Sequence, residues 1–145
     1  MPNKVSTVLE KKGLSVVTVA PHDTVAAAVR VLVTNRIGAA PVLDRDGRLV
    51  GIISERDILR GTADHGDRVL ALRVDQLMTR EVRTCTPDDQ IVELMEIMTV
   101  RRIRHLPVMR DGALVGIISI GDVVKERLEA AQAELEALRS YIASA

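Results

Sequence analysis

The chain contains no phenylalanine and no tryptophan, and Tyr141 is its only tyrosine. The aromatic side chains on which many proteins stack single-stranded nucleic acid are therefore missing. An excess of either charge is missing too, because 20 lysines and arginines balance 20 aspartates and glutamates. A basic excess is what draws proteins to nucleic acids and anionic membranes, so we expect neither as a main partner.

Cysteine is nearly absent, since Cys85 is the only one. A single cysteine excludes an internal disulfide framework and suits a reducing compartment. The sequence shows no signal-peptide pattern and no apolar run long enough to span a membrane. We therefore expect a soluble, cytoplasmic protein.

An internal repeat is the main positive feature of the sequence. The segment GRLVGIISERD, from Gly47 to Asp57, returns as GALVGIISIGD, from Gly112 to Asp122. A Pro-Val pair precedes each segment, and the residues upstream also match at a constant spacing. The chain is therefore predicted to be two copies of one unit. A unit of about 60 residues is marginal by itself, so we expect the copies to pack as one domain with the function between them.

Hydrophobic periodicity predicts the elements of each copy. Apolar residues at helical spacing indicate one helix in the first copy and an equivalent helix in the second; they are Val25, Ala28, Val29 and Leu32, matched by Ile91, Leu94, Met95 and Met98. Short runs rich in Val and Ile, with Asp-Gly turns at Asp46-Gly47 and Asp111-Gly112, indicate β-hairpins. Each unit should read strand, helix, strand, hairpin, strand, helix, which is an α/β (α+β) fold.

The two copies are assigned to residues 7–62 and 75–128, with a linker at 63–74 and a helical extension at 129–145. We expect Gly61 to end the last helix of the first copy, and a short helical turn near Val69 to Leu72. The extension carries apolar residues at heptad-like spacing: Val124, Leu128, Ala131, Leu135, Leu138 and Ile142. This helix either folds back on its own domain or forms a dimer.

Each copy ends in a Ser-x-x-Asp signature, Ser54 to Asp57 and Ser119 to Asp122. The structural interpretation is a capping box, in which the serine side chain accepts a hydrogen bond from a backbone N–H in the first turn of a helix. The acid three residues later accepts one from the backbone N–H of the serine. The functional interpretation is a binding site, because a helix N-terminus attracts anions and a carboxylate accepts hydrogen bonds from a ribose diol. Each serine can cap a helix and also lie at a binding site. For each aspartate, the capping role and the ligand-binding role compete.

The two matched copies, each with a Pro-Val strand and a Gly-hydrophobic-hydrophobic-Ser-x-x-Asp signature, resemble a pair of CBS domains (cystathionine β-synthase domains), the unit called a Bateman module. The resemblance covers residues 7 to 128. It implies a pseudo-symmetric module whose clefts bind an adenosyl ligand such as AMP, ADP, ATP, S-adenosylmethionine or NAD. It also implies that Asp57 and Asp122 bind ribose, with Ser54 and Ser119 near the ribose or phosphate.

Further binding residues follow from the same resemblance. It implies that the strand before each hairpin and the segment before the second copy also line the clefts. The complete set of expected ligand-binding residues is Ile37, Gly38, Ala39, Ile52, Ser54, Arg56, Asp57, Thr79, Val82, Ile103, Arg104, His105, Ile117, Ser119, Gly121 and Asp122.

The copies differ where phosphates would lie, which suggests two unequal sites. The second copy offers Arg104 and His105 for phosphate oxygens, whereas the first carries Arg56, where the second has Gly121. Arg104 is expected to bind ligand, while His105 is either a ligand residue or a core histidine. Lys11 and Lys12 are expected to be solvated and are not assigned to a site.

No catalytic constellation is visible. Cys85 aligns with a strand residue and is expected to be a small core residue, and the three histidines show no metal-ligand spacing. A P-loop and a dinucleotide fingerprint are also absent. Two functions remain. One is a regulatory sensor that binds an adenosyl ligand, forms a homodimer and signals to a protein partner not identified by the sequence; the other is a constitutive dimerisation or assembly module without nucleotide.

Overall fold

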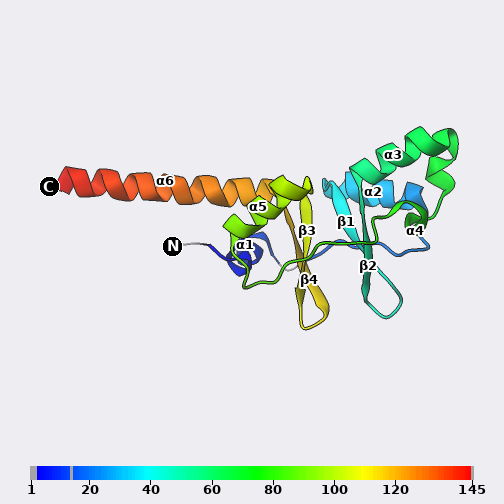
Figure 1. Ribbon diagram of the computed structural model, residues 1–145, viewed down its shortest axis with the longest axis horizontal. Coiled ribbons are helices and arrows are strands. Elements are labelled where there is room, and N and C mark those ends of the chain that lie inside the picture. The colour runs from blue at the N-terminus through cyan, green and yellow to red at the C-terminus, as the bar shows by residue number, and fades with distance from the viewer. Residues whose placement is uncertain (1–2, 14, 145) are drawn as a thin grey trace.

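Each copy of the repeat forms an antiparallel hairpin preceded and followed by a helix, in a computed structural model that describes residues 3–13 and 15–144. Figure 1 shows the copies side by side, with a long helix projecting from the second. The first copy consists of α2 (Val25–Asn35), β1 (Ala39–Leu43), β2 (Leu49–Ser54) and α3 (Glu55–His65). The second consists of α5 (Ile91–Arg101), β3 (His105–Arg110), β4 (Ala113–Ser119) and α6 (Ile120–Ser144). The predicted α/β fold of two repeats is confirmed.

The two hairpins keep the same register around their Pro-Val pairs. Pro41 lies opposite Ile52, and Pro107 lies opposite Ile117. In the second hairpin Asp111 and Gly112 both have positive φ, 52° and 79°, as a two-residue type I′ turn requires. The first hairpin has a longer turn, which Asp44 closes by accepting hydrogen bonds from two backbone N–H groups.

At the start of each copy, the structure has an isolated β-bridge of one residue where a strand was expected. Val19 pairs in parallel with Val42, and Cys85 pairs in the same way with Val108. The next hydrogen bond of each parallel ladder would need an N–H two residues further on, where Pro21 and Pro87 have none. The prolines therefore stop the strands that the Val-rich pattern predicted.

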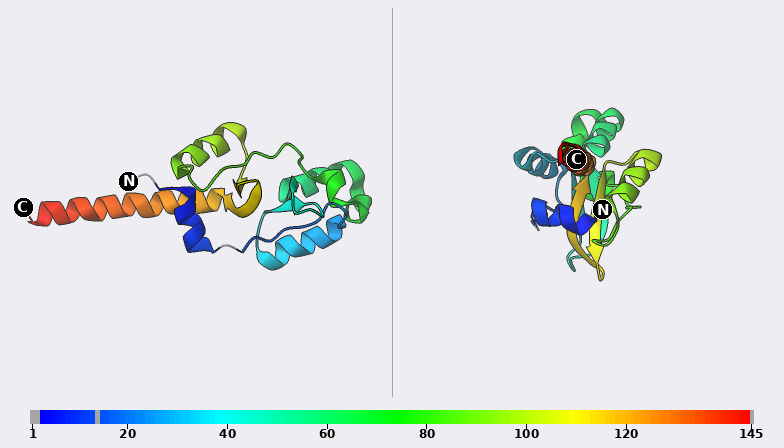
Figure 2. Two further views of the ribbon diagram at one scale, coloured as in Figure 1. Left: turned by 90° about the horizontal axis from the view of Figure 1, so that it is seen from below. Right: turned by 90° about the vertical axis from the view of Figure 1, so that its left-hand side faces the viewer.

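Two short helices are exchanged between the copies, which the repeat pattern did not predict. Helix α1 (Val5–Lys12) begins the chain, yet its apolar side chains lie in the core of the second copy. Helix α4 (Val74–Leu77), which precedes the second copy, packs against the first. Figure 2 shows α1 beside the start of α6. Each copy therefore completes its core with a helix that belongs, by sequence order, to the other copy.

Each copy has its own cluster of buried side chains. The core of the first contains Val19, Ala28, Leu32, Ala40, Val42, Ile53, Val74 and Met78. The core of the second contains Val5, Val8, Leu9, Cys85, Ile91, Leu94, Met98, Leu106, Val108, Ile118 and Val123. Cys85 is thus a core residue, as expected, and burial raises its pKa to about 12.

The expected end of α3 at Gly61 is wrong. The helix continues to His65, and Gly61 lies at a close contact with α4, where an added Cβ would stand 2.8 Å from Leu77. The glycine is therefore used for helix packing rather than for helix termination. The helical turn expected near Val69 is present as a 3-10 helix, η1 (Gly66–Ala71).

The fold-back interpretation of the C-terminal helix is also wrong. Helix α6 leaves the body of the molecule after its first turns and projects away from it (Figure 1). Val123 and Glu126 are buried at its base, whereas residues 131–144 are all exposed. The apolar stripe of this helix thus faces solvent.

Candidate ligand-binding site

The first Ser-x-x-Asp signature forms the capping box that the sequence suggested. The backbone N–H of Asp57 donates to the Ser54 hydroxyl, and Asp57 Oδ2 accepts from both the backbone N–H and the hydroxyl of Ser54. Thr79, from the segment after α4, donates its hydroxyl to Asp57 Oδ1 at 3.0 Å. These three hydrogen bonds hold a carboxylate that is only 6% exposed, and they leave acceptor capacity on Oδ1.

The second signature has the same cap but a different neighbour. Ser119 and Asp122 make the two reciprocal cap hydrogen bonds, at 2.9 and 3.1 Å. The remaining partner of Asp122 Oδ2 is the ammonium of Lys12, at 2.6 Å. Lys12 Nζ also donates to the Ile117 carbonyl at 2.8 Å. The expectation that Lys12 is merely solvated is therefore wrong.

A cavity of about 420 Å³ opens in front of Asp57, between the two copies. The first copy contributes the ends of β1 and β2 and the start of α3. The segment after α4 contributes Thr79, Glu81, Val82 and Arg83, and the residues that lead into β3 complete the wall. Its lining residues are Gly38, Ala39, Ile52, Ser54, Glu55, Arg56, Asp57, Leu59, Arg60, Thr79, Glu81, Val82, Arg83, Arg102, Ile103, Arg104 and His105.

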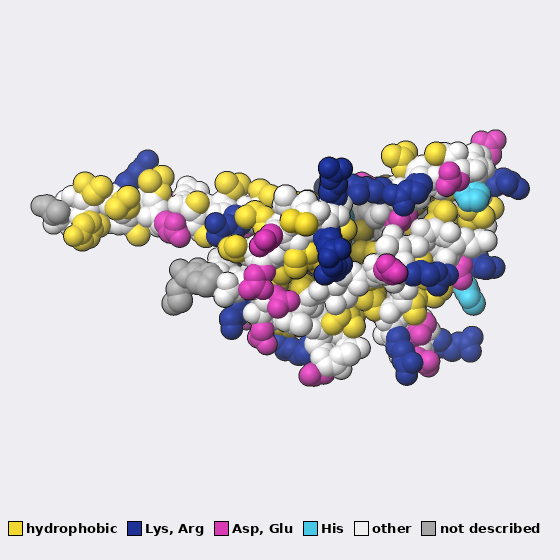
Figure 3. Space-filling model, viewed as in Figure 1, with side chains coloured by type: hydrophobic (Ala, Val, Ile, Leu, Met, Phe, Trp, Pro, Cys, Tyr) yellow, Lys and Arg dark blue, Asp and Glu magenta, His cyan; other side chains and the backbone are white. Residues whose placement is uncertain are grey.

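The charged groups of this cavity favour an anion. Five arginines line it, at positions 56, 60, 83, 102 and 104, against three acids, at positions 55, 57 and 81. Figure 3 shows lysine and arginine side chains gathered where the two copies meet. Arg56 also donates from its guanidinium to the Arg102 carbonyl at 3.1 Å, which joins the two copies across the cavity. The site thus combines a carboxylate with an excess of guanidinium groups suited to phosphate.

His105 lies where the copies face each other. Its imidazole is so close to Gly38 that a Cβ there would stand 3.3 Å from His105 Cε1, with the Glu55 carboxyl beside it. Burial lowers the pKa of His105 and the charge of Lys12 lowers it further, against the opposing effect of Glu55 and Asp122. A neutral imidazole at this position can donate or accept a hydrogen bond.

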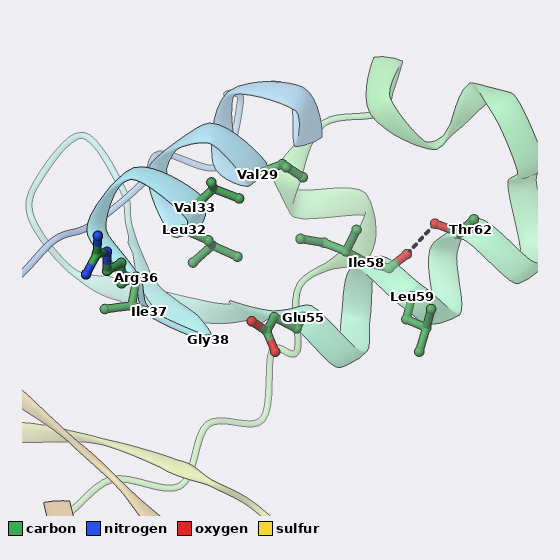
Figure 4. Close-up of a pocket in the computed structure, with 10 residues that line it drawn as sticks. All are labelled: Val29, Leu32, Val33, Arg36, Ile37, Gly38, Glu55, Ile58, Leu59 and Thr62. Atoms are coloured by element: carbon green, nitrogen blue, oxygen red, sulfur yellow. Dashed lines mark hydrogen bonds between the residues drawn. The ribbon is translucent and has the colours of Figure 1, made fainter. Parts of the chain in front are cut away.

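Eleven of the sixteen expected site residues line the cavity, and five lie elsewhere. The structure brings Arg56, Arg104 and His105 to this one cavity instead of dividing them between two sites. Ile37 lies instead in a groove of about 540 Å³ between α2 and α3, which Figure 4 shows in close-up. Ile117, Ser119, Gly121 and Asp122 belong to the second signature, where Asp122 pairs with Lys12.

Sequence reasoning missed six residues of this cavity: Glu55, Leu59, Arg60, Glu81, Arg83 and Arg102. A signal for Arg60 was present, because it follows Arg56 by one helical turn and shares its face of α3. Lys12 gave no such signal, since its role depends on where α1 packs. Among residues 3–13 and 15–144 the structure shows no group of His, Cys, Asp and Glu side chains that could hold a metal ion. Within that part of the chain, every helix is too short or too polar to cross a membrane.

A comparison with protein-family models matches the CBS domain twice, at residues 8–64 and 74–129. The chain belongs to the CBS-domain family. CBS domains generally bind adenosyl ligands. A mitochondrial CBS domain-containing protein of Arabidopsis thaliana is 38% identical over 124 residues, which cover 83% of this chain and 60% of that protein. The chain thus spans about three fifths of the length of that relative.

Solved structures of CBS pairs have the same fold. A CBS-domain containing protein from Agrobacterium tumefaciens is similar with a TM-score of 0.84 and 44% identity, covering 88% of this chain and 95% of that one. A candidate signal-transduction protein with CBS domains from Burkholderia ambifaria is similar with a TM-score of 0.82 and 37% identity, covering 88% and 95%. The arrangement of two repeats is therefore shared with CBS pairs at substantial sequence identity.

Proposed function

We propose that this CBS pair is a regulatory module that binds an adenosyl ligand, AMP, ADP, ATP or NAD, in the cavity at Asp57 and signals to a protein partner. The observation that carries the proposal is the composition of this one cavity. It joins a buried carboxylate, suited to a ribose diol, with five arginines suited to phosphate. Its volume of about 420 Å³ lies within the range of small-molecule sites.

Signalling requires that the ligand prefer one arrangement of the two copies over another. The cavity meets this condition, because residues of both copies line it. A ligand between Asp57 and Arg104 would contact both copies and compete with the hydrogen bond from Arg56 to the Arg102 carbonyl. Helix α6 begins at the second signature and would carry a change in the second copy outward.

The proposal involves no catalysis. The hydroxyl groups of Ser54 and Ser119 are engaged as helix caps. Cys85 is buried, and its raised pKa keeps it a thiol rather than a nucleophilic thiolate.

The test is thermal unfolding of the purified protein with AMP, ADP, ATP, NAD and S-adenosylmethionine, with GTP as a control. A ligand at 100 times its Kd stabilises the native state by about 2.7 kcal/mol, which raises Tm by roughly 5 to 10 °C in a chain of this size. Asp57→Asn should abolish that shift, because the amide has one acceptor oxygen in place of two, and Ser54 already binds one of the two carboxylate oxygens. The matched control is Asp46→Asn in the exposed hairpin turn, which should keep the full shift. No shift with any adenosyl compound, or an undiminished shift in Asp57→Asn, would contradict the proposal.

A specific observation also favours assembly as a function. Leu128, Leu138 and Ile142 of α6 are 65%, 55% and 65% exposed, although they belong to a heptad-like stripe. We propose that a second copy of the chain covers this stripe in a parallel coiled coil and so forms a homodimer. In that register Glu134 of one helix faces Arg139 of the other, a pair of opposite charges beside the seam.

A further inference from the structure

The arginines of the cavity at Asp57 are not paired with its acids. Five guanidinium groups and three carboxylates line the same cavity. Over residues 3–13 and 15–144, however, the structure has no ion pair between any of these arginines and a carboxylate. Arg73, which lies outside the cavity, does pair with Asp75 at 3.0 Å. Unpaired like charges that line one cavity raise its positive potential and favour an anion.

Two of the three acids have other neighbours. Asp57 caps α3 and accepts the Thr79 hydroxyl. Glu55 lies beside His105, since both side chains come within 3.6 Å of a Cβ placed on Gly38. Most of the arginine charge is therefore available to a ligand.

The fold itself does not require these arginines, because the other copy lacks most of them. The two hairpins have the same register, so positions in one copy can be compared with those in the other at a spacing of 66 residues before the hairpin turn and 65 after it. The equivalents of arginines 56, 60, 83, 102 and 104 are Gly121, Lys125, Val17, Arg36 and Gly38. Three of the five positions are thus uncharged in the other copy, which indicates that the arginines serve this cavity rather than the fold.

Arg60 stands one helical turn beyond Arg56 on α3. Arg56 is in the first turn, next to the carboxylate proposed to hold ribose, and residues four apart lie about 5 to 6 Å from each other on one helix face. Arg83 lines the same cavity from the segment that supplies Thr79. In a nucleotide the first phosphate is attached to the ribose, and further phosphates extend the chain away from it. Arg60 is therefore placed for a phosphate beyond the one near Arg56.

The number of guanidinium groups also exceeds what one phosphate needs. A terminal phosphate has three acceptor oxygens, and a forked guanidinium binds two of them. Two arginines therefore engage all three oxygens when one oxygen is shared. A cavity with five arginines suits a ligand with a chain of phosphates.

We infer that the cavity selects adenosyl ligands with a chain of terminal phosphates, ADP and ATP over AMP and NAD, and that Arg60 and Arg83 bind the phosphates beyond the first. NAD is disfavoured because a second nucleoside follows its two phosphates. The inference rests on the proposed adenosyl function and adds to it the class of ligand.

Isothermal titration calorimetry of the full chain with AMP, ADP, ATP and NAD, without Mg²⁺ and at one ionic strength, tests this preference. The wild type should bind ATP at least about 10-fold more tightly than AMP, because hydrogen bonds between charged groups are the strong ones. Arg60→Gln should weaken ATP binding by about 5-fold or more and change AMP binding by less than about 2-fold. Adding Arg83→Gln should bring the ATP and AMP affinities within about 3-fold of each other.

The matched control is Arg45→Gln. It removes the same charge from the exposed turn of the first hairpin, so it should keep the ratio of ATP to AMP affinity unchanged. Arg60 is exposed as well, so its replacement should not disturb the fold, and unchanged AMP binding verifies this.

The outcomes separate this inference from the function on which it rests. Equal affinities of the wild type for ATP and AMP would overturn the inference and leave the adenosyl function intact. An ATP preference that survives when both arginines are replaced, or one that Arg45→Gln reduces equally, would overturn the roles of Arg60 and Arg83. Absence of binding of every adenosyl compound to the wild type would instead count against the proposed function itself.

Discussion

At the scale of single residues, the signature aspartates have a structural role that any binding role must share. Asp57 caps α3 together with Ser54 and also accepts the Thr79 hydroxyl, so three hydrogen bonds depend on one buried carboxylate. The sequence presented capping and ligand binding as competing interpretations for this residue. The structure shows the cap and places the same carboxylate on the wall of the cavity.

Removing this carboxylate should therefore destabilise the protein even without ligand. Asp57→Ala should lower the free energy of unfolding by about 2 kcal/mol, from the lost cap and the unsatisfied partners. Urea denaturation measures the loss. Asp46→Ala, in the exposed hairpin turn, should change the free energy by less than about 0.5 kcal/mol. Equal values for the two variants would contradict the observed hydrogen bonding of Asp57.

His105 should make stability depend on pH near neutrality. Burial, then Lys12, lowers its pKa in the folded state below the ordinary value of 6.5, against Glu55 and Asp122, with Arg104 adding to the lowering. Between the folded and unfolded pKa values the unfolded chain binds more protons, so stability is full above 6.5 and declines as the pH falls toward the folded pKa. Urea denaturation between pH 8 and pH 5 measures this decline.

The matched variant for this prediction is His105→Gln, which retains a polar side chain of similar size but does not titrate. The pH dependence of the wild type should exceed that of His105→Gln in the range just below 6.5. His22 and His65 are the same in both proteins, so they cancel in the difference. Parallel curves for the two proteins would contradict a lowered pKa at His105.

At the scale of elements, the glycine of each Gly-Ile-Ile-Ser strand lets an exchanged helix approach the sheet. A Cβ on Gly51 would stand 2.6 Å from Met78 Sδ and 2.9 Å from the Thr79 carbonyl oxygen. A Cβ on Gly116 would stand 2.5 Å from Leu9 Cδ2, the end of a side chain. The repeated glycine thus marks where α4 and α1 cross the hairpins.

These contacts predict an ordered series of stabilities. Gly51→Ala should cost about 1 to 3 kcal/mol, because a backbone carbonyl cannot rotate away. Gly116→Ala should lower the free energy of unfolding by less, since the Leu9 side chain can change rotamer. Gly121→Ala is the control, because its Cβ would meet nothing nearer than 3.6 Å inside α6 and alanine favours a helix by about 0.5 to 1 kcal/mol. Chemical denaturation of the three variants checks the order, and a Gly51→Ala protein as stable as the wild type would refute the close approach.

At the scale of the whole molecule, α6 is the element that reaches furthest from the two cores. Its base is tied to α1, because Glu126 is buried and accepts from Lys11 at 3.1 Å and from Asn3. Its outer part carries the exposed stripe with Leu128, Leu135 and Ile142. A change at the second signature would therefore move a surface available to a second copy.

Sedimentation velocity at micromolar concentration tests the proposed homodimer. The wild type should sediment with the mass of two chains, and Leu135→Glu should sediment as one, because a charge in the seam cannot be buried without a partner. Ala137→Glu adds the same charge to the opposite face of α6 and should remain a dimer. A wild type that stays monomeric, or a Leu135→Glu variant that stays dimeric, would contradict the proposed seam.

The sequence by itself determined the repeat, the hairpins, the helices beginning at Val25 and Ile91, and the two capping boxes. These features depend on periodicity, turn residues and spacings of a few positions, which are local properties of the chain. Most of the residues that line the cavity at Asp57 were expected too, but from the resemblance to CBS domains rather than from local patterns. Pro21 and Pro87 were visible in the sequence, but their effect on the parallel ladder depends on which carbonyl would have been the partner.

Only the tertiary structure decided which helices and side chains of one copy pack against the other copy. The packing of α1 on the second core, the contact of Gly61 with Leu77 and the pairing of Lys12 with Asp122 all join residues far apart in the chain. No local pattern encodes such contacts, since they depend on the path of the connecting segments through space. The exposure of α6 was decided in the same way, because a heptad stripe is identical in sequence whether it meets its own domain or solvent.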